Sequence, residues 1–172
     1  MGIEYEARYW VENKKYLLKK LEELGFKNIK EVYQKDIIFI KDKNIFRIRI
    51  SGNKQLLEYK QLLDNRRWEE ISLEISDWKK AVKILSKLVP LNKIIEKRRQ
   101  IYKSNNFLVE ICIDDIKCLG TFIEIEGKKE DVEKLVKLLN LKKEAEPYGK
   151  LLDNLYKQGK VNYDFKNFEI IC

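Results

Sequence analysis

The sequence predicts an α+β protein in which about eight mainly antiparallel strands form a sheet and about four helices pack on its apolar face. Strand-like segments outnumber helical ones, and most are joined by short turns, which favours antiparallel pairing. Several strands carry charged side chains at every second position, because neighbouring side chains of a strand point to opposite faces. In residues 3–8, Glu4, Glu6 and Arg8 share one face of the strand, and the apolar side chains share the other.

The segment after this first strand has the features of a helix over residues 13–25. Asn13 is a typical N-cap, leucines follow at helical spacing, and Gly25 suits the position just after the last helical turn. The next strands are expected at about residues 31–40, 44–50, 55–62 and 66–75, with turns at 51–53 and 64–65.

The second half of the chain repeats this alternation. Asp77 is expected to cap a second helix that Pro90 ends, since the residue before a proline avoids the helical conformation. Strands are then expected at about residues 93–102, 107–113 and 121–126, and helices at about 130–140 and 148–157. The tail after about residue 158 shows no pattern that places it.

Bulk composition limits the class of protein. A chain of 172 residues suits a single domain with a substantial core, and we expect residues 1–172 to form one domain. Its apolar runs are too short to span a bilayer and its start lacks a signal-peptide pattern, so a cytoplasmic protein without a membrane partner is expected. Cys112, Cys118 and Cys172 show no metal-ligand spacing and are expected to be reduced thiols.

The charge balance points to an anionic partner. A net charge of +8 favours nucleic acid, a membrane surface or a phosphorylated small molecule. Nucleic acid is the weakest of these, because acidic side chains share the strand faces with the basic ones. The sequence contains no histidine, so any catalysis must rest on carboxylates, lysine, tyrosine or a metal ion.

Each charged stripe taken alone also has a purely structural explanation. Arg47 and Arg49 could lie on a solvated edge strand, residues 97–99 could be a surface charge run, residues 124–126 the polar face of an outer strand, and Asp114 a turn residue. Taken together, these structural explanations are less plausible, because five strands would each need, independently, a charged face opposite an apolar face. An open sheet would turn the charged face to water, whereas a closed barrel would turn it inward.

A closed barrel with this interior has to be a hydrated tunnel. Burying an isolated ion costs on the order of tens of kcal/mol, and ion pairing compensates that cost poorly. Basic side chains on these faces suit phosphate oxygens, and the candidates are Arg8, Arg47, Arg49, Lys60, Lys97 and Arg99. Carboxylates beside phosphate suit a bridging Mg²⁺ or Mn²⁺, and the candidate ligands are Glu4, Glu6, Glu70, Glu74, Asp114, Glu124 and Glu126.

Six segments in this order resemble the CYTH superfamily, also called triphosphate tunnel metalloenzymes. They are Glu4-x-Glu6-x-Arg8, Phe46-Arg47-Ile48-Arg49, Leu57-Glu58-Tyr59-Lys60, Glu69-Glu70-Ile71 with Glu74, Lys97 to Tyr102, and Asp114 to Glu126 with its Leu-Gly-Thr-Phe stretch. Each segment alone is a weak signal, and the six in order make a strong one over about residues 3–152. The resemblance implies an eight-stranded antiparallel tunnel that holds a triphosphate and a divalent metal ion.

Length and the Leu-Gly-Thr-Phe stretch are most similar to the class IV adenylyl cyclase branch. That resemblance implies conversion of ATP to cyclic AMP and pyrophosphate; the alternatives are an inorganic triphosphatase or a thiamine triphosphatase, and a protein that binds triphosphate without turnover. The sequence leaves the oligomeric state open, a homodimer included. Arg8 departs from the lysine that the family usually has there, and arginine stays protonated. Arg8 can therefore hold phosphate but cannot be a general base, and we assign no residue to that role.

Overall fold

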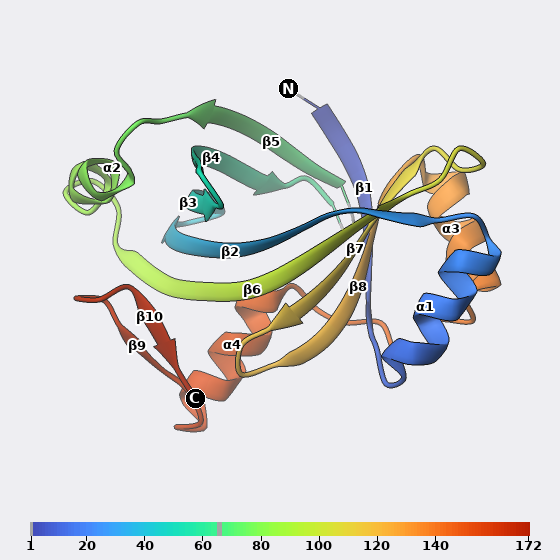
Figure 1. Cartoon of the computed structure of the whole chain (residues 1–172). Coiled ribbons are helices and arrows are strands. Elements are labelled where there is room, and N and C mark those ends of the chain that lie inside the picture. The colour runs from blue at the N-terminus through green and yellow to red at the C-terminus, as the bar shows by residue number, and fades with distance from the viewer. Residues whose placement is uncertain (1, 65–66) are drawn as a thin grey trace.

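The computed structural model of the chain describes residues 2–64 and 67–172, apart from the side chains of residues 2–4. Within these residues, eight antiparallel strands close into a barrel in the order β1–β5–β4–β3–β2–β6–β7–β8, and β8 pairs with β1 (Figure 1). Their bounds are Gly2–Trp10, Lys27–Lys41, Asn44–Ser51, Lys54–Leu62, Arg67–Glu74, Leu91–Lys103, Val109–Ile116 and Gly120–Gly127 for β1 to β8. The predicted antiparallel barrel is confirmed, whereas the turn expected at residues 64–65 lies partly outside the described residues.

Four helices lie outside the barrel in the described part of the chain. They are α1 (Lys14–Glu23), α2 (Trp78–Leu85), α3 (Lys129–Leu138) and α4 (Tyr148–Lys157). The expected N-caps are present: Asn13 accepts a hydrogen bond from the Tyr16 backbone at 2.9 Å, and Asp77 accepts one from the Lys80 backbone at 3.0 Å. No helix among the described residues is both long and apolar enough to cross a bilayer.

The strand alternation decides which side chains face outward. On one side of the barrel, α1 and α3 cover apolar residues such as Ala7 and Ile125, and on the opposite side α2 covers Ile37 and Ile48 (Figure 1). The intervening residues of the same strands are charged and face inward. The amphipathic strands therefore place the hydrocarbon under helices and the charges inside the barrel, as their period of two requires.

Helix α4 differs from the other three, because it packs against inward-facing side chains. Tyr148 and Leu152 are buried in a cluster with Phe122 and Ile95, which lie on the inner faces of β8 and β6. The Lys93 ammonium group donates hydrogen bonds to the Gly149 carbonyl, at 3.0 Å, and to the Asp153 carboxylate. These contacts place the start of α4 against the inner faces of β6 and β8, where Tyr148 lines the cavity.

The C-terminal tail folds back over the barrel as a hairpin of β9 (Asn162–Asp164) and β10 (Glu169–Ile171). Ile170 is buried, and its backbone N–H donates to the Glu96 carboxylate at 3.2 Å. Cys172 forms a disulfide with Cys118 in the β7–β8 turn, with Cα atoms 5.4 Å apart. The expectation of three reduced thiols is therefore wrong for these two, and only the return of the tail reveals the pairing; Cys112 remains a buried free thiol.

Breaking this disulfide is expected to destabilise the protein. The bond spans 54 residues of sequence, and restraining a loop of that size in the unfolded chain stabilises the folded state by about 2–4 kcal/mol. Urea unfolding with and without dithiothreitol should show this loss in the wild type. The variant Cys172→Ser should start from the lower stability and should not respond to the reductant; equal stability of oxidised and reduced wild type would contradict the prediction.

Candidate metal and triphosphate site

The barrel encloses a cavity of about 740 Å³. This volume lies within the range of protein sites for small organic ligands. All eight barrel strands contribute charged side chains to its lining, namely Glu6, Arg8, Asp36, Arg47, Arg49, Lys60, Glu70, Lys93, Lys97, Arg99, Glu110, Glu124 and Glu126. The inner faces of all the barrel strands thus contribute to one site.

Three carboxylates meet on the wall formed by β1 and β8. The register pairs Glu6 with Glu126 and Arg8 with Glu124, so the alternating residues of the two strands lie side by side. Each of Glu6, Glu124 and Glu126 has an oxygen within 4.8 Å of the others. Carboxylate oxygens are the ligands that Mg²⁺ and Mn²⁺ prefer, so this donor set fits such an ion. Burial, and then the charge of Glu124, raise the pKa of Glu6. Burial also opposes the charged form of Glu124, but Arg99 and Arg8 hold the pKa of that carboxyl well below its ordinary value.

Two arginines lie against the same cluster. The Arg8 guanidinium donates to Glu124 at 2.7 and 3.0 Å and to Glu6, and its Cζ lies 4.3 Å from the centre of the Tyr148 ring. Arg99 donates to Glu124 at 2.7 Å. Burial alone would lower the pKa of Arg8, but Glu6 and Glu124 raise it above its ordinary value. Arg8 therefore keeps its positive charge in the site.

The opposite wall of the barrel carries a second array of paired charges. Arg49 makes two hydrogen bonds of 2.7 Å to Asp36. Arg47 donates to Glu58 and, at 3.4 Å, to Glu70, and Lys60 lies 2.8 Å from Glu70. Since each cation here has a carboxylate partner, a phosphate group entering the cavity would have to compete with that carboxylate or share the cation with it.

All six predicted phosphate-binding residues line this cavity, and so do four of the seven predicted metal ligands. The ten are Glu6, Arg8, Arg47, Arg49, Lys60, Glu70, Lys97, Arg99, Glu124 and Glu126. Glu74 is exposed at the end of β5 and is not among the described residues that line the cavity. The Glu4 side chain lies outside the described residues.

Asp114 faces the barrel interior from β7 but is not among the described residues that line the cavity. Its side chain is 0% exposed. It accepts hydrogen bonds from Arg99 at 2.7 and 2.6 Å, from the Tyr148 hydroxyl at 3.1 Å and from Lys97 at 3.3 Å. With both oxygens engaged by these donors, Asp114 acts as a counter-ion that fixes two of the cavity's cations.

The sequence interpretation missed several residues of the site. Asp36 was not predicted as a site residue, yet it faces inward and pairs with Arg49. Glu58 was not predicted as a site residue either, and it is buried against Arg47. Tyr148 carries no sequence signal, because only the docking of α4 brings it to the cavity. The alternation of side chains along β2 and β6 could have identified Asp36 and Lys93 as inward-facing residues.

Burial changes the ionisation of two further groups in the cavity. The pKa of Lys97 is lowered, by burial first and then by the positive charge of Arg99, although Asp114 acts in the opposite direction. The pKa of Tyr148 is raised well above its ordinary value by burial and by the charges of Glu124 and Asp114. The Tyr148 hydroxyl therefore remains a hydrogen-bond donor at neutral pH.

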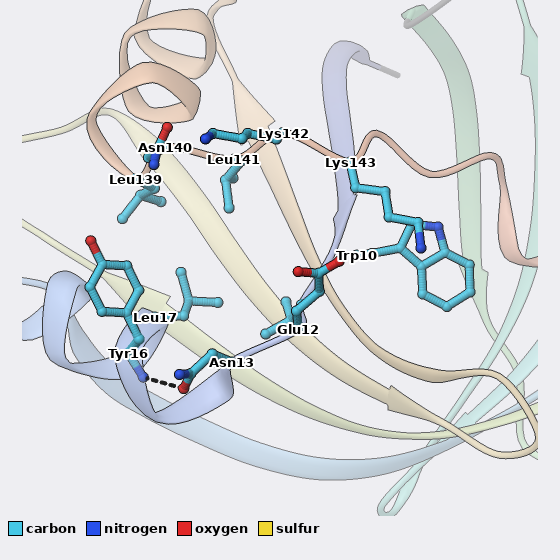
Figure 2. A pocket seen from close by; sticks show the side chains of 11 residues that line it. Trp10, Glu12, Asn13, Tyr16, Leu17, Leu139, Asn140, Leu141, Lys142 and Lys143 are labelled. Atoms are coloured by element: carbon cyan, nitrogen blue, oxygen red, sulfur yellow. Dashed lines mark hydrogen bonds between the residues drawn. The ribbon is translucent and has the colours of Figure 1, made fainter.

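A smaller pocket of about 260 Å³ lies outside the barrel, between the start of α1 and residues 139–143. Figure 2 shows Tyr16, Glu12 and Lys143 around it, with the N-cap bond of Asn13 at its edge. The described residues that line it include none of the predicted metal or phosphate ligands. The cavity inside the barrel is therefore the candidate site.

Comparison with known proteins gives consistent matches. A sequence model of the CYTH domain matches residues 2–155. A Methanocaldococcus jannaschii protein, named as a proposed adenylate cyclase, is 32% identical over 152 residues, which cover 80% of this chain and 83% of that protein. A conserved hypothetical protein of Pyrococcus furiosus is 27% identical with a TM-score of 0.78, covering 86% of this chain and 99% of that one. The PH1012 protein of Pyrococcus horikoshii is 26% identical, also with a TM-score of 0.78, over 86% and 98% of the two chains.

Proposed function

Because the chain belongs to the CYTH domain family, we propose that it is a divalent-metal-dependent enzyme that acts on a triphosphate inside the barrel. More specifically, we propose an adenylyl cyclase that converts ATP to cyclic AMP and pyrophosphate. The observation that carries the proposal is the meeting of Glu6, Glu124 and Glu126 with an array of arginines and lysines in one cavity. Acids alone would repel a triphosphate, and bases alone would not need a metal ion.

The proposed roles follow from the chemistry of the side chains. Glu6, Glu124 and Glu126 would hold Mg²⁺ or Mn²⁺, which when bound neutralises phosphate charge and polarises phosphorus–oxygen bonds. Arg47, Arg49, Lys60, Lys97 and Arg99 would hold the phosphate oxygens, the arginines in two-pronged geometry. Arg8 would lie between these carboxylates and the phosphate-binding cations, where its permanent charge would help to hold the acidic cluster and the substrate together.

The cyclase reaction joins the ribose 3′-hydroxyl oxygen to the α-phosphorus and breaks the bond between that phosphorus and the bridging oxygen of pyrophosphate. The hydroxyl proton passes to solvent in this step, and pyrophosphate is the leaving group. Holding the triphosphate at both walls of the barrel would align the reacting atoms and stabilise the charge that builds on the leaving pyrophosphate. A hydrolase would use the same side chains but present water to the terminal phosphorus.

Product identification separates these reactions. The protein is incubated with Mg²⁺ or Mn²⁺ and, in separate samples, with ATP, tripolyphosphate or thiamine triphosphate, and the products are identified by phosphorus NMR. Cyclic AMP with pyrophosphate supports the cyclase, whereas orthophosphate released from tripolyphosphate or thiamine triphosphate supports a hydrolase. Binding without any product would identify a protein that binds triphosphate without turnover. The absence of both binding and product would refute the proposed function.

A bound metal–triphosphate is expected to stabilise the fold. Ligand at about 100 times its dissociation constant adds about 2.7 kcal/mol to the free energy of unfolding, because it binds only the folded state. Thermal unfolding with Mg²⁺ and a non-hydrolysable ATP analogue should therefore show a higher midpoint than with either component alone. Sodium sulfate at equal ionic strength is the control, and an equal rise with sulfate would show that any anion suffices.

A further inference from the structure

The segment that joins α3 to α4 is bound to β1 beside the candidate site. The backbone N–H of Trp10 donates to the Lys143 carbonyl at 2.9 Å, and the backbone N–H of Ala145 donates to the Arg8 carbonyl at 2.8 Å. Tyr148, the first residue of α4, follows shortly after this contact. The two backbone bonds therefore place Tyr148 close to the side chain of Arg8.

The Tyr148 ring contacts apolar and charged groups at the same time. It packs edge-on against Phe122, with the ring centres 5.0 Å apart. The Arg8 Cζ lies 4.3 Å from the centre of the Tyr148 ring, and the Lys97 ammonium nitrogen lies 5.4 Å from it. The face of an aromatic ring attracts a cation, and it does so more strongly where water is excluded. Because Tyr148 is buried, its ring can hold the Arg8 guanidinium in place.

Arg8 in turn contacts two of the proposed metal ligands. Its guanidinium group donates to the carboxylates of Glu6 and Glu124. Groups that hydrogen-bond to metal ligands orient those ligands, and their replacement typically costs about 10- to 100-fold in metal affinity or activity. A long arginine side chain has many rotamers of its own, so its direction depends on what packs against it. The Tyr148 ring is the aromatic surface on which Arg8 lies.

The hydroxyl group of Tyr148 makes a separate contact, which is less important for the site. It donates to Asp114 at 3.1 Å. Arg99 already donates two hydrogen bonds to that carboxylate, at 2.6 and 2.7 Å. Asp114 therefore keeps its main partner when the hydroxyl is removed, whereas Arg8 loses its aromatic contact when the ring is removed.

We propose that Tyr148 is a positioning residue of the candidate site, because its ring holds the Arg8 guanidinium against Glu6 and Glu124. This inference rests on the proposed function of the cavity as a metal and triphosphate site. It also gives α4 a role in the reaction. The Lys93 ammonium group, which bonds to the first turn of the helix, would keep Tyr148 seated over the cavity.

The first test separates the ring from the hydroxyl group by measuring kcat and KM with Mn²⁺ and whichever triphosphate is turned over. Tyr148→Leu should lower kcat by about 10- to 100-fold, as expected when a metal ligand loses its orienting partner. Tyr148→Phe should keep most of the wild-type kcat, because the aromatic face remains. The matched control is Tyr156→Leu on the same helix: Tyr156 is 53% exposed, and its replacement should leave kcat unchanged.

A double-mutant cycle shows whether Tyr148 acts through Arg8. Arg8→Lys keeps the positive charge but has no planar guanidinium group to stack on a ring. In that background Tyr148→Leu should lower kcat by less than about threefold, because the effects of two residues that act together are not additive. A purely structural role of Tyr148 would give the same loss of kcat in both backgrounds. Circular dichroism checks that every variant is folded under the assay conditions.

The outcomes distinguish failure of this inference from failure of the proposed function. An unchanged kcat in Tyr148→Leu, an equal loss in Tyr148→Phe, or an equal loss in the Arg8→Lys background would overturn the positioning role while the wild-type activity stands. If the wild type binds a triphosphate without turnover, the dissociation constant of a non-hydrolysable ATP analogue with Mn²⁺ takes the place of kcat, and the variants should rank in the same order. If the wild type neither binds nor turns over a triphosphate, both the inference and the proposed function fail.

Discussion

Replacing Glu6 and Glu126 together with glutamine is expected to lower metal-dependent turnover by a factor on the order of 100 or more. Loss of a single outer-shell partner of a metal site already costs about 10- to 100-fold in affinity or activity, and here two direct ligands change. Glutamine keeps the shape and one acceptor oxygen, so the hydrogen bond that Arg8 donates to Glu6 can persist. The barrel should therefore remain folded, as circular dichroism would show.

The matched control for this pair is Glu74→Gln. Glu74 was also predicted to be a metal ligand, but it is exposed and absent from the described lining of the cavity. We expect this variant to keep the wild-type rate and the wild-type affinity for Mn²⁺, measured by electron paramagnetic resonance. If the double variant at Glu6 and Glu126 retained the wild-type rate, or if Glu74→Gln lost it, the assignment of the metal site would be wrong.

Replacing Asp114 with alanine is expected to destabilise the protein by about 3–5 kcal/mol, because removing one partner of a buried ion pair leaves an uncompensated buried charge. In this case the remaining charges are Arg99 and Lys97, which are buried and bond to Asp114. Urea unfolding at pH 7 measures the loss. The neighbouring Asp115→Ala is the control: Asp115 and its partner Lys14 are more than a third exposed, and such surface pairs contribute about 0–1 kcal/mol.

The same carboxylate gives the stability a defined dependence on pH. Burial opposes the charged form of Asp114, but Lys97 and Arg99 hold its pKa below the ordinary value. A carboxyl group with a lowered pKa in the folded state stabilises that state above its unfolded pKa of about 3.9, and this contribution disappears as the pH falls through the folded pKa. Wild-type stability should therefore drop below about pH 4 more steeply than that of Asp114→Ala; parallel curves would contradict the role of Asp114.

The sequence was sufficient to predict which side chains face the interior of the barrel. A strand has a period of two, so Arg47 with Arg49, and Glu124 with Glu126, must share a face whatever the tertiary structure. The amphipathic helices required an apolar surface, which assigned the charged faces to the other side. Closure of the sheet into a barrel came from the family resemblance, because alternation alone is equally compatible with an open sheet.

Sequence alternation could not show how far along the barrel each side chain lies or what covers it. Glu74 shares a face of β5 with Glu70. However, it is the last residue of that strand, opposite Leu56, and it is not among the described residues that line the cavity. Asp114 also lies on the inward face of its strand, yet Arg99 and Lys97 of β6 and Tyr148 of α4 engage it. Tyr148 and the disulfide partner Cys172 depend on where α4 and the tail dock, which is decided by long-range packing and not by local pattern.

The most direct test of the joint metal and triphosphate site is a crystal structure with Mn²⁺ and a non-hydrolysable ATP analogue, with anomalous data collected at the manganese edge. We expect a manganese peak between the carboxylates of Glu6, Glu124 and Glu126, and phosphate oxygens within hydrogen-bond distance of cations from both walls, Arg49 and Lys60 among them. A manganese peak elsewhere, or a triphosphate bound on the outer surface of the barrel, would contradict the assignment of the interior as the site of reaction.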